Sequence, residues 1–146
     1  MQKSYTTATM STPERFKFEE LEVWKLALEY LDVVYDLTAK LPRDEDFNLK
    51  SQMRRAATSI GLNIAEGSTG QSNAEQARFI GMALRSLIET VACLRIIQRR
   101  DLCNSAEVDA LNVQAHRISA MLQAFRKSLE GSNTRVSEDS SEYRED

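Results

Sequence analysis

The chain has 146 residues, the size of one ordinary domain, and its 19 basic and 22 acidic residues give a net charge of −3. This balance excludes a bulk basic coat for nucleic acid, although a local basic patch is compatible with it. With 5 Gly and 2 Pro, the chain has too few turn residues for an all-β sandwich or barrel. No apolar run approaches the ~20 residues of a membrane span. The first residues also lack the apolar core of a secretory signal. We therefore expect a cytoplasmic protein that does not contact a membrane.

The N-terminal part of the chain predicts a loose segment followed by a long helix. Residues 1–17 are polar and rich in Ser and Thr, so we expect them to be flexible. The helix is predicted from about Glu19 to Leu41, because Pro42 cannot continue it. Apolar residues recur along it at steps of three and four, which favours one core-facing stripe. This stripe consists of Leu21, Trp24, Leu28, Leu31 and Tyr35.

A second apolar stripe lies beside the first on the same helix. It consists of Val23, Ala27, Tyr30, Val34 and Leu37. A helix of a four-helix bundle needs only one apolar side for its own core, so the second stripe favours a partner subunit. We therefore predict a homo-oligomer whose interface includes Val23, Ala27, Tyr30 and Val34. The alternative is a single wide stripe that faces the core.

The second helix is predicted from about Phe47 to Ser68, with glycines at its end. Gly61 lies inside it and costs about 1 kcal/mol relative to alanine, so it should have a packing reason. Polar residues form a ladder beside the apolar stripe: Gln52, Arg55, Ser59, Asn63 and Glu66. The ladder contains no His, Cys or Lys that could act as nucleophile or base. A hydrogen-bonded network between helices or subunits is therefore favoured over an active site.

Capping boxes predict the starts of two further helices. Ser72-x-x-Glu75 opens a helix to about Arg100, and Asn104-x-x-Glu107 opens a last helix with apolar steps of three and four.

Four long helices with short connections predict an all-α fold, an antiparallel up-down-up-down four-helix bundle over residues 18–131. Residues 132–146 hold 5 acidic and 2 basic residues and little to bury. We expect them to form a disordered acidic tail.

Arginines form a row on the predicted third helix. Arg78, Arg85 and Arg99 lie at multiples of seven residues, and Arg95 and Arg100 add charge at one end. The first helix carries an acidic row at the same spacing, namely Glu22, Glu29 and Asp36. Three interpretations stay open: a solvated charged face, ion pairing between subunits, and binding of an anionic partner.

Metal and enzymatic chemistry have little support in the sequence. Cys93, Cys103 and His116 are three potential soft ligands, whereas a structural zinc site needs four in paired spacing. There is no glycine-rich phosphate loop and no nucleophile–base pair. We therefore expect no metal, no cofactor, no catalytic residue and no enzymatic activity.

The segment Leu49–Gly67, LKSQMRRAATSIGLNIAEG, resembles the Q-x-x-R-A-x-x-S-I-x-x-N-I-A-E-G signature of four-helix-bundle proteins related to the 23S rRNA intervening-sequence protein. Further matches to this family's pattern bring the resemblance to about residues 16–128. These are Phe18-x-x-Leu21-x-Val23-Trp24-Lys25, Leu41-Pro42, Arg78-Phe79 and Ser86-Leu87-x-Glu89.

The resemblance implies a non-enzymatic, ring-like homopentamer. It also implies a relation to the accessory variability protein of diversity-generating retroelements, which binds nucleic acid and works with a reverse transcriptase. We therefore expect binding of RNA or DNA, or of a partner such as a reverse transcriptase or the ribosome, through arginines of the second and third helices. The candidate residues are Arg54, Arg55, Arg78, Arg85, Arg95, Arg99 and Arg100.

The expected polar network comprises Gln52, Ser59, Asn63, Glu66, Ser86 and Glu89. The alternative function is a purely structural self-assembling protein whose charged stripes pair between subunits.

Overall fold

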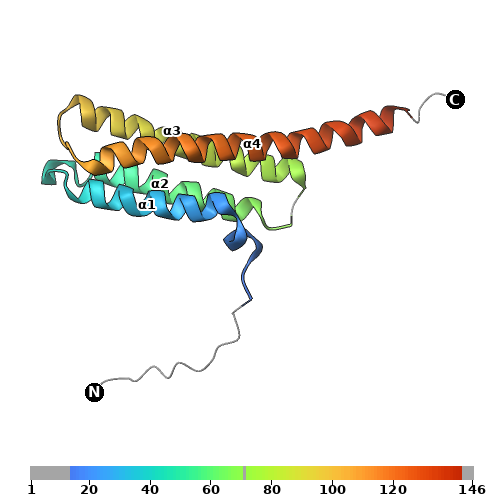
Figure 1. Ribbon diagram of the computed structural model, residues 1–146, viewed down its shortest axis with the longest axis horizontal. Helices are drawn as coiled ribbons and strands as arrows, with labels where there is room; N and C mark the ends of the chain where they lie inside the picture. Colours follow the sequence, from blue (N-terminus) through green and yellow to red (C-terminus); the bar gives the residue numbers. More distant parts are fainter. Residues whose placement is uncertain (1–13, 71, 143–146) are drawn as a thin grey trace, which may run out of the picture.

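The computed structural model describes the backbone of residues 14–70 and 72–142, and the side chains of these ranges up to residue 131. The regular structure in these ranges is helical: η1 (Lys17–Glu20), α1 (Glu22–Ala39), η2 (Arg43–Glu45), α2 (Leu49–Gly67), α3 (Asn73–Arg99) and α4 (Ala106–Glu142). Figure 1 shows four long helices side by side, with α1 and α3 each packed against both α2 and α4. The all-α, up-down-up-down bundle predicted from the sequence is therefore confirmed.

A side-chain cap marks the start of α3. The hydroxyl of Ser72 accepts a hydrogen bond from the backbone N–H of Glu75 at 3.2 Å, as the predicted capping box requires. The start predicted from Asn104 is wrong by one residue, because α4 begins at Ala106. There the backbone carbonyl of Ser105 accepts the N–H of Val108 at 3.1 Å.

The first and the last helical segments along the chain differ in detail from the prediction. Residues 17–20 form a 3-10 turn before α1, where we expected continuous helix from Glu19. The backbone of α4 runs on to Glu142, beyond the predicted end near residue 131. The expected flexibility of residues 1–13 lies outside the described residues. The structure does not describe the side chains of residues 132–146, for which we expected a disordered tail. The flexibility of the N-terminal segment and the disorder of this tail therefore remain predictions.

The core takes one stripe from each helix. Its largest fully buried side chains are Tyr30, Leu37, Met53, Ile60, Ile64, Ile80, Leu87, Leu94, Ile97, Leu111, Ile118 and Leu122. Cys93 is also buried, Cys103 is half-buried, and both are free thiols. Within the described residues, no helix has the combination of length and apolar character needed to cross a bilayer.

The two apolar stripes of α1 are exchanged relative to the prediction. Val23, Ala27, Tyr30 and Val34 are at most 4% exposed within a single chain, so the assignment of these residues to a subunit interface is wrong. The stripe expected in the core is the more exposed one, because Leu28 is 40% and Tyr35 44% exposed. Two neighbouring apolar stripes allow either rotation of the helix, and contacts across the bundle choose between them.

One such contact is a buried hydrogen bond between diagonal helices. The Tyr30 hydroxyl lies 2.7 Å from the Thr90 Oγ1, and that oxygen donates its own proton to the Leu87 carbonyl at 2.6 Å. The phenol of Tyr30 is therefore the donor to Thr90. Burial raises the pKa of Tyr30 above its usual value. This bond fixes α1 to α3 through the middle of the core and orients the Tyr30 stripe inward.

Candidate nucleic-acid interface

Half of the predicted polar network exists, and it joins α2 to α3. Asn63 donates to the carbonyl oxygen and the hydroxyl of Ser59 at 2.9 and 3.0 Å, and the Ser86 hydroxyl donates to Ser59 at 2.9 Å. The other three predicted members are exposed and lie outside this cluster: Gln52, Glu66 and Glu89. The cluster is a structural link between helices and contains no group poised for catalysis.

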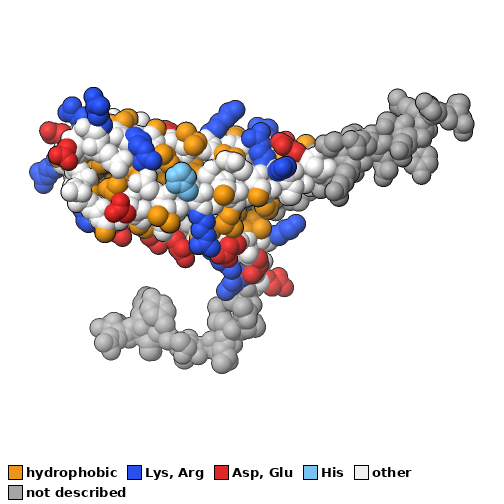
Figure 2. All heavy atoms as spheres, turned by 45° about the horizontal axis from the view of Figure 1, so that its top comes forward, with side chains coloured by type: hydrophobic (Ala, Val, Ile, Leu, Met, Phe, Trp, Pro, Cys, Tyr) orange, Lys and Arg blue, Asp and Glu red, His pale blue; other side chains and the backbone are white. Residues whose placement is uncertain are grey.

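A row of shallow clefts follows the line between α3 and α4. The clefts have volumes of about 330, 340 and 160 Å³ and share lining residues. We name this row the α3–α4 groove. Its polar and charged lining consists of Arg78, Arg85, Arg95, Asn112, His116, Ser119, Gln123 and Arg126. Figure 2 shows basic side chains and apolar ones interspersed on the face that this view presents.

Two of the groove's arginines are held by a carboxylate of their own helix. The guanidinium of Arg78 contacts Glu75 at 2.6 Å, and that of Arg126 contacts Glu130 at 3.2 Å. The hydrogen-bonded ion pair with Glu75 raises the pKa of the Arg78 guanidinium above its usual value. These contacts restrict where the two guanidinium groups can lie.

The other two arginines of the groove have no acidic partner among the described residues. Arg95 donates to the amide oxygens of Asn112 at 2.8 Å and Gln98 at 3.0 Å. Arg85 is exposed and makes no hydrogen bond or ion pair within the described part of the chain. Because Arg85 lines the same cleft as Arg78 and Arg126, three guanidinium groups surround one concave surface.

Gly81 shapes this cleft. A Cβ atom added at Gly81 would lie 3.4 Å from the Cζ of Arg126, so the missing side chain leaves room for that guanidinium beside α3. Sequence reasoning missed both residues as parts of a site. The available signal was the glycine itself, because a glycine inside a helix costs about 1 kcal/mol relative to alanine.

The arginines predicted on α2 lie elsewhere. Arg54 donates to the Thr38 hydroxyl at 2.8 Å and to the Tyr35 carbonyl at 3.3 Å, and it stacks on the Tyr35 ring at 4.2 Å. Arg54 thus braces α2 against α1 and does not line the groove, and its role as a binding residue stays a prediction. Three further candidates are exposed but do not line the groove: Arg55, Arg99 and Arg100.

On the side of the bundle formed by α1 and α2, apolar side chains are left partly or largely exposed. We name it the α1–α2 face, and it comprises Phe16, Trp24, Leu28, Leu31, Tyr35 and Leu62. Gly61 has its packing reason here, since an added Cβ would lie 3.1 Å from the Cζ3 of Trp24. The indole therefore rests directly on the backbone of α2.

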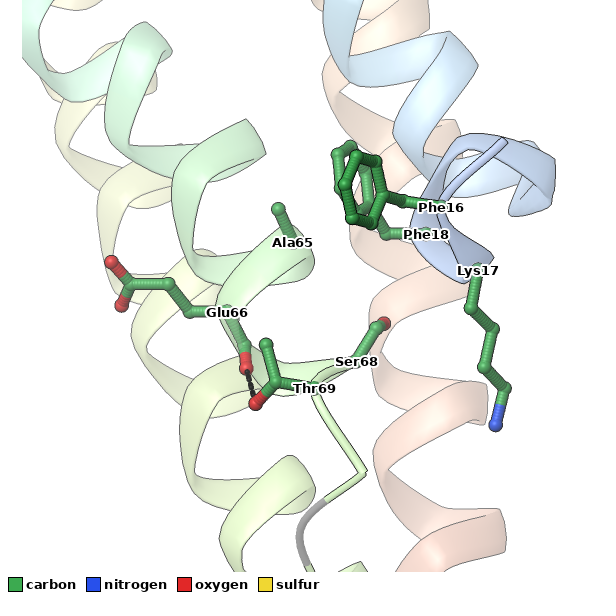
Figure 3. A pocket seen from close by; sticks show the side chains of 7 residues that line it. All are labelled: Phe16, Lys17, Phe18, Ala65, Glu66, Ser68 and Thr69. Carbon is green, nitrogen blue, oxygen red and sulfur yellow. Dashed lines mark hydrogen bonds between the residues drawn. The ribbon is translucent and has the colours of Figure 1, made fainter. Parts of the chain in front are cut away.

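The α1–α2 face ends in a cleft of about 540 Å³ between η1 and the end of α2. In Figure 3 the stacked rings of Phe16 and Phe18 lie opposite Ala65, while the carboxylate of Glu66 points away. Phe18 also packs edge-on against Trp24, with ring centroids 4.7 Å apart. Aromatic side chains therefore extend the apolar surface beyond α1.

The acidic row of α1 lies outside the groove. Glu22, Glu29 and Asp36 are exposed. Among the described residues, Glu22 and Glu29 pair with no basic side chain, and Asp36 interacts electrostatically with Lys40. At the C-terminal end of α1, the amine of Lys40 lies 2.6 Å from the carboxylate of Glu107 and lowers the pKa of that carboxyl group to about 2. Within the described ranges, no group of three or more His, Cys, Asp or Glu side chains is placed to hold a metal ion.

Comparison with known proteins places this arrangement in a family. The chain is similar to a crystal structure of a protein of unknown function from the S23 ribosomal protein family of Bacteroides thetaiotaomicron VPI-5482. The two sequences are 26% identical, the match covers 72% of this chain and 98% of the other, and the TM-score is 0.66. No curated protein matches the chain significantly. A family model described as 23S rRNA-intervening sequence protein matches residues 19–124. The chain therefore belongs to the 23S rRNA-intervening sequence protein family.

Proposed function

We propose that the protein is a non-enzymatic homo-oligomer that binds RNA through its α3–α4 groove and assembles through its α1–α2 face. The observation that carries the binding proposal is the gathering of Arg78, Arg85 and Arg126 around one cleft, with Arg95 further along the same groove. Guanidinium groups donate several hydrogen bonds in a fixed plane and suit phosphate oxygens.

The other groove residues fit the same function. Asn112, His116, Ser119 and Gln123 add neutral hydrogen-bonding groups between the arginines, and they can contact phosphate or sugar oxygens. The family to which the chain belongs is named for an insertion in 23S rRNA, and this supports RNA as the polymer.

The assembly proposal rests on the α1–α2 face. Its exposed apolar side chains are of the kind that a subunit interface covers, because large exposed apolar patches often mark sites of protein association. Leu28, Tyr35 and Leu62 are between 40% and 56% exposed in the single chain. The pentamer implied by the sequence resemblance is our proposed oligomeric state.

The alternative is a purely structural assembly in which the exposed Glu22, Glu29 and Asp36 of one subunit pair with groove arginines of another. The observation that favours it is that Glu22 and Glu29 interact with no basic side chain among the described residues. This alternative requires that substitutions of the groove arginines change the mass of the oligomer.

Fluorescence anisotropy with a labelled RNA hairpin tests the binding proposal. The variant Arg85→Glu/Arg126→Glu should weaken binding at least about 10-fold, because two phosphate-binding cations become repulsive anions. The matched control is Arg55→Glu/Arg117→Glu, which changes the net charge equally at exposed residues outside the groove. Equal losses in both variants, or no binding by the wild type, would refute binding through this groove.

Light scattering after size exclusion tests the assembly proposal on the same proteins. Leu28→Glu/Leu62→Glu should reduce the wild-type oligomer to smaller species while circular dichroism still reports a folded helical protein. The groove variants should keep the wild-type mass. A monomeric wild type would overturn the assembly proposal, and loss of assembly in the groove variants would favour charge pairing between subunits.

A further inference from the structure

We propose that the cleft formed by Arg78, Arg85 and Arg126 holds one internal phosphodiester of a nucleic-acid strand, and that Gly81 is the residue that keeps this cleft open. This inference rests on the proposed RNA binding and deepens it.

The position follows from the geometry of the cleft. Arg78 and Arg85 project from α3 two helical turns apart, and Arg126 reaches across from α4. The cleft has a volume of about 330 Å³, with Gly81 and Met82 as its only uncharged lining residues among those described. Its lining contains no aromatic side chain on which a base could stack. The cleft therefore suits the phosphate–sugar backbone rather than a base.

The charge of the cleft selects the kind of phosphate. Three guanidinium groups contribute +3, and the paired carboxylates of Glu75 and Glu130 contribute −2, which leaves a net charge of 3 − 2 = +1. An internal phosphodiester carries one negative charge, whereas a terminal phosphate carries about −1.5 to −2 at neutral pH. The net charge thus matches a phosphodiester within the strand.

Gly81 determines whether the third arginine can take part. Because the Cζ of Arg126 lies 3.4 Å from the position of an added Cβ, a larger side chain at residue 81 would push this guanidinium away from α3. It would also fill the space between Arg78 and Arg85. A substitution at Gly81 should therefore remove a phosphate contact without changing any charge of the protein.

The experiment measures affinity for one RNA hairpin, prepared with a 5′-hydroxyl and with a 5′-phosphate, as a function of salt. Gly81→Leu and Arg85→Gln should each weaken binding about 6-fold at 0.1 M salt. This is the gain in affinity that one phosphate contact gives when the salt concentration falls from 1 M to 0.1 M, at a slope of about 0.7 to 0.9. Each should also make the salt slope shallower by about 1. Ala124→Leu is the control for Gly81→Leu, since Ala124 is exposed on α4 outside the groove.

The outcomes separate this inference from the proposed function. Absence of hairpin binding by the wild type would defeat both. Wild-type binding that is unchanged by Gly81→Leu and Arg85→Gln would overturn the cleft inference alone. Binding that is 10-fold tighter for the 5′-phosphorylated hairpin would assign the cleft to a terminal phosphate instead. If Gly81→Leu does not fold, as judged by circular dichroism, Arg85→Gln and Arg126→Gln decide between these results.

Discussion

The hydrogen bond between Tyr30 and Thr90 offers a direct test of which side of α1 faces the core. Tyr30→Phe removes the donor, but Thr90 keeps its own bond to the Leu87 carbonyl, so the expected loss in free energy of unfolding is about 1 kcal/mol. Thr90→Val instead leaves the phenol hydroxyl of Tyr30 without a partner at a fully buried position. This should cost more, about 2 kcal/mol.

Urea denaturation of the two single variants and the double variant measures these losses. With a slope of about 2 kcal/mol per molar urea, the midpoint should fall by about 0.5 M for Tyr30→Phe and about 1 M for Thr90→Val. The double variant should lose less than the sum, because it leaves no unpaired hydroxyl. Additive losses would refute the bond. A Tyr30→Phe protein of unchanged stability but smaller oligomeric mass would return Tyr30 to a subunit interface.

Three further perturbations test other parts of the structure. Glu107→Gln should destabilise the protein most near pH 7 and progressively less as the pH falls from about 5 to 2. The reason is that the ion pair with Lys40 lowers the pKa of Glu107 to about 2 and is lost when this carboxylate is protonated. Unfolding midpoints measured across this pH range test the expectation. Gly61→Ala should shift the fluorescence of the single tryptophan, since the added methyl group contacts the indole. Asn63→Leu should cost about 1 kcal/mol by thermal denaturation, and Glu66→Ala should stay within about 0.5 kcal/mol because Glu66 is exposed.

Different observations would contradict each of these three expectations. A stability difference for Glu107→Gln that is the same at pH 7 and pH 2 would show that the ion pair contributes nothing. An unchanged emission spectrum for Gly61→Ala would mean that the indole does not rest on α2. Equal effects of Asn63→Leu and Glu66→Ala would return Glu66 to the polar network.

The bundle could be predicted from the sequence because its signals are local. Steps of three and four residues identify each helix, Pro42 ends the first one, and Ser72 caps the third as expected. The start of α4 was harder to place, because Asn104 and Ser105 are both good capping residues and only the backbone geometry distinguishes them. Such errors shift an element by a residue or two and leave the fold unchanged.

The rotation of α1 could not be predicted, because the two stripes are similarly apolar. Tyr30 and Thr90 lie 60 residues apart, and no local pattern shows that they meet in the core. The same limit applies to the groove. Arg78 and Arg85 were found from their spacing on one helix, whereas Arg126 comes from another helix and is brought to them by the packing of α3 on α4.

Sequence reasoning also could not foresee which arginines would be available. Arg54 has the same charge and a similar helical setting to the groove arginines, but the fold places the Thr38 hydroxyl and the Tyr35 ring against it. Whether a guanidinium is engaged or accessible depends on neighbours from other helices. Patterns of charge therefore pointed to candidate arginines, and the structure shows which of them share one groove.

The salt dependence of RNA affinity tests the central claim most directly. If the cleft lined by Arg78, Arg85 and Arg126 holds one phosphodiester, it should contribute about −0.7 to −0.9 to the slope of log affinity against log salt. Replacing all three arginines with glutamine removes this one phosphate contact and should make the slope shallower by about 1, with the mass of the oligomer unchanged. A triple variant that retains the wild-type slope and affinity would contradict RNA binding through the α3–α4 groove.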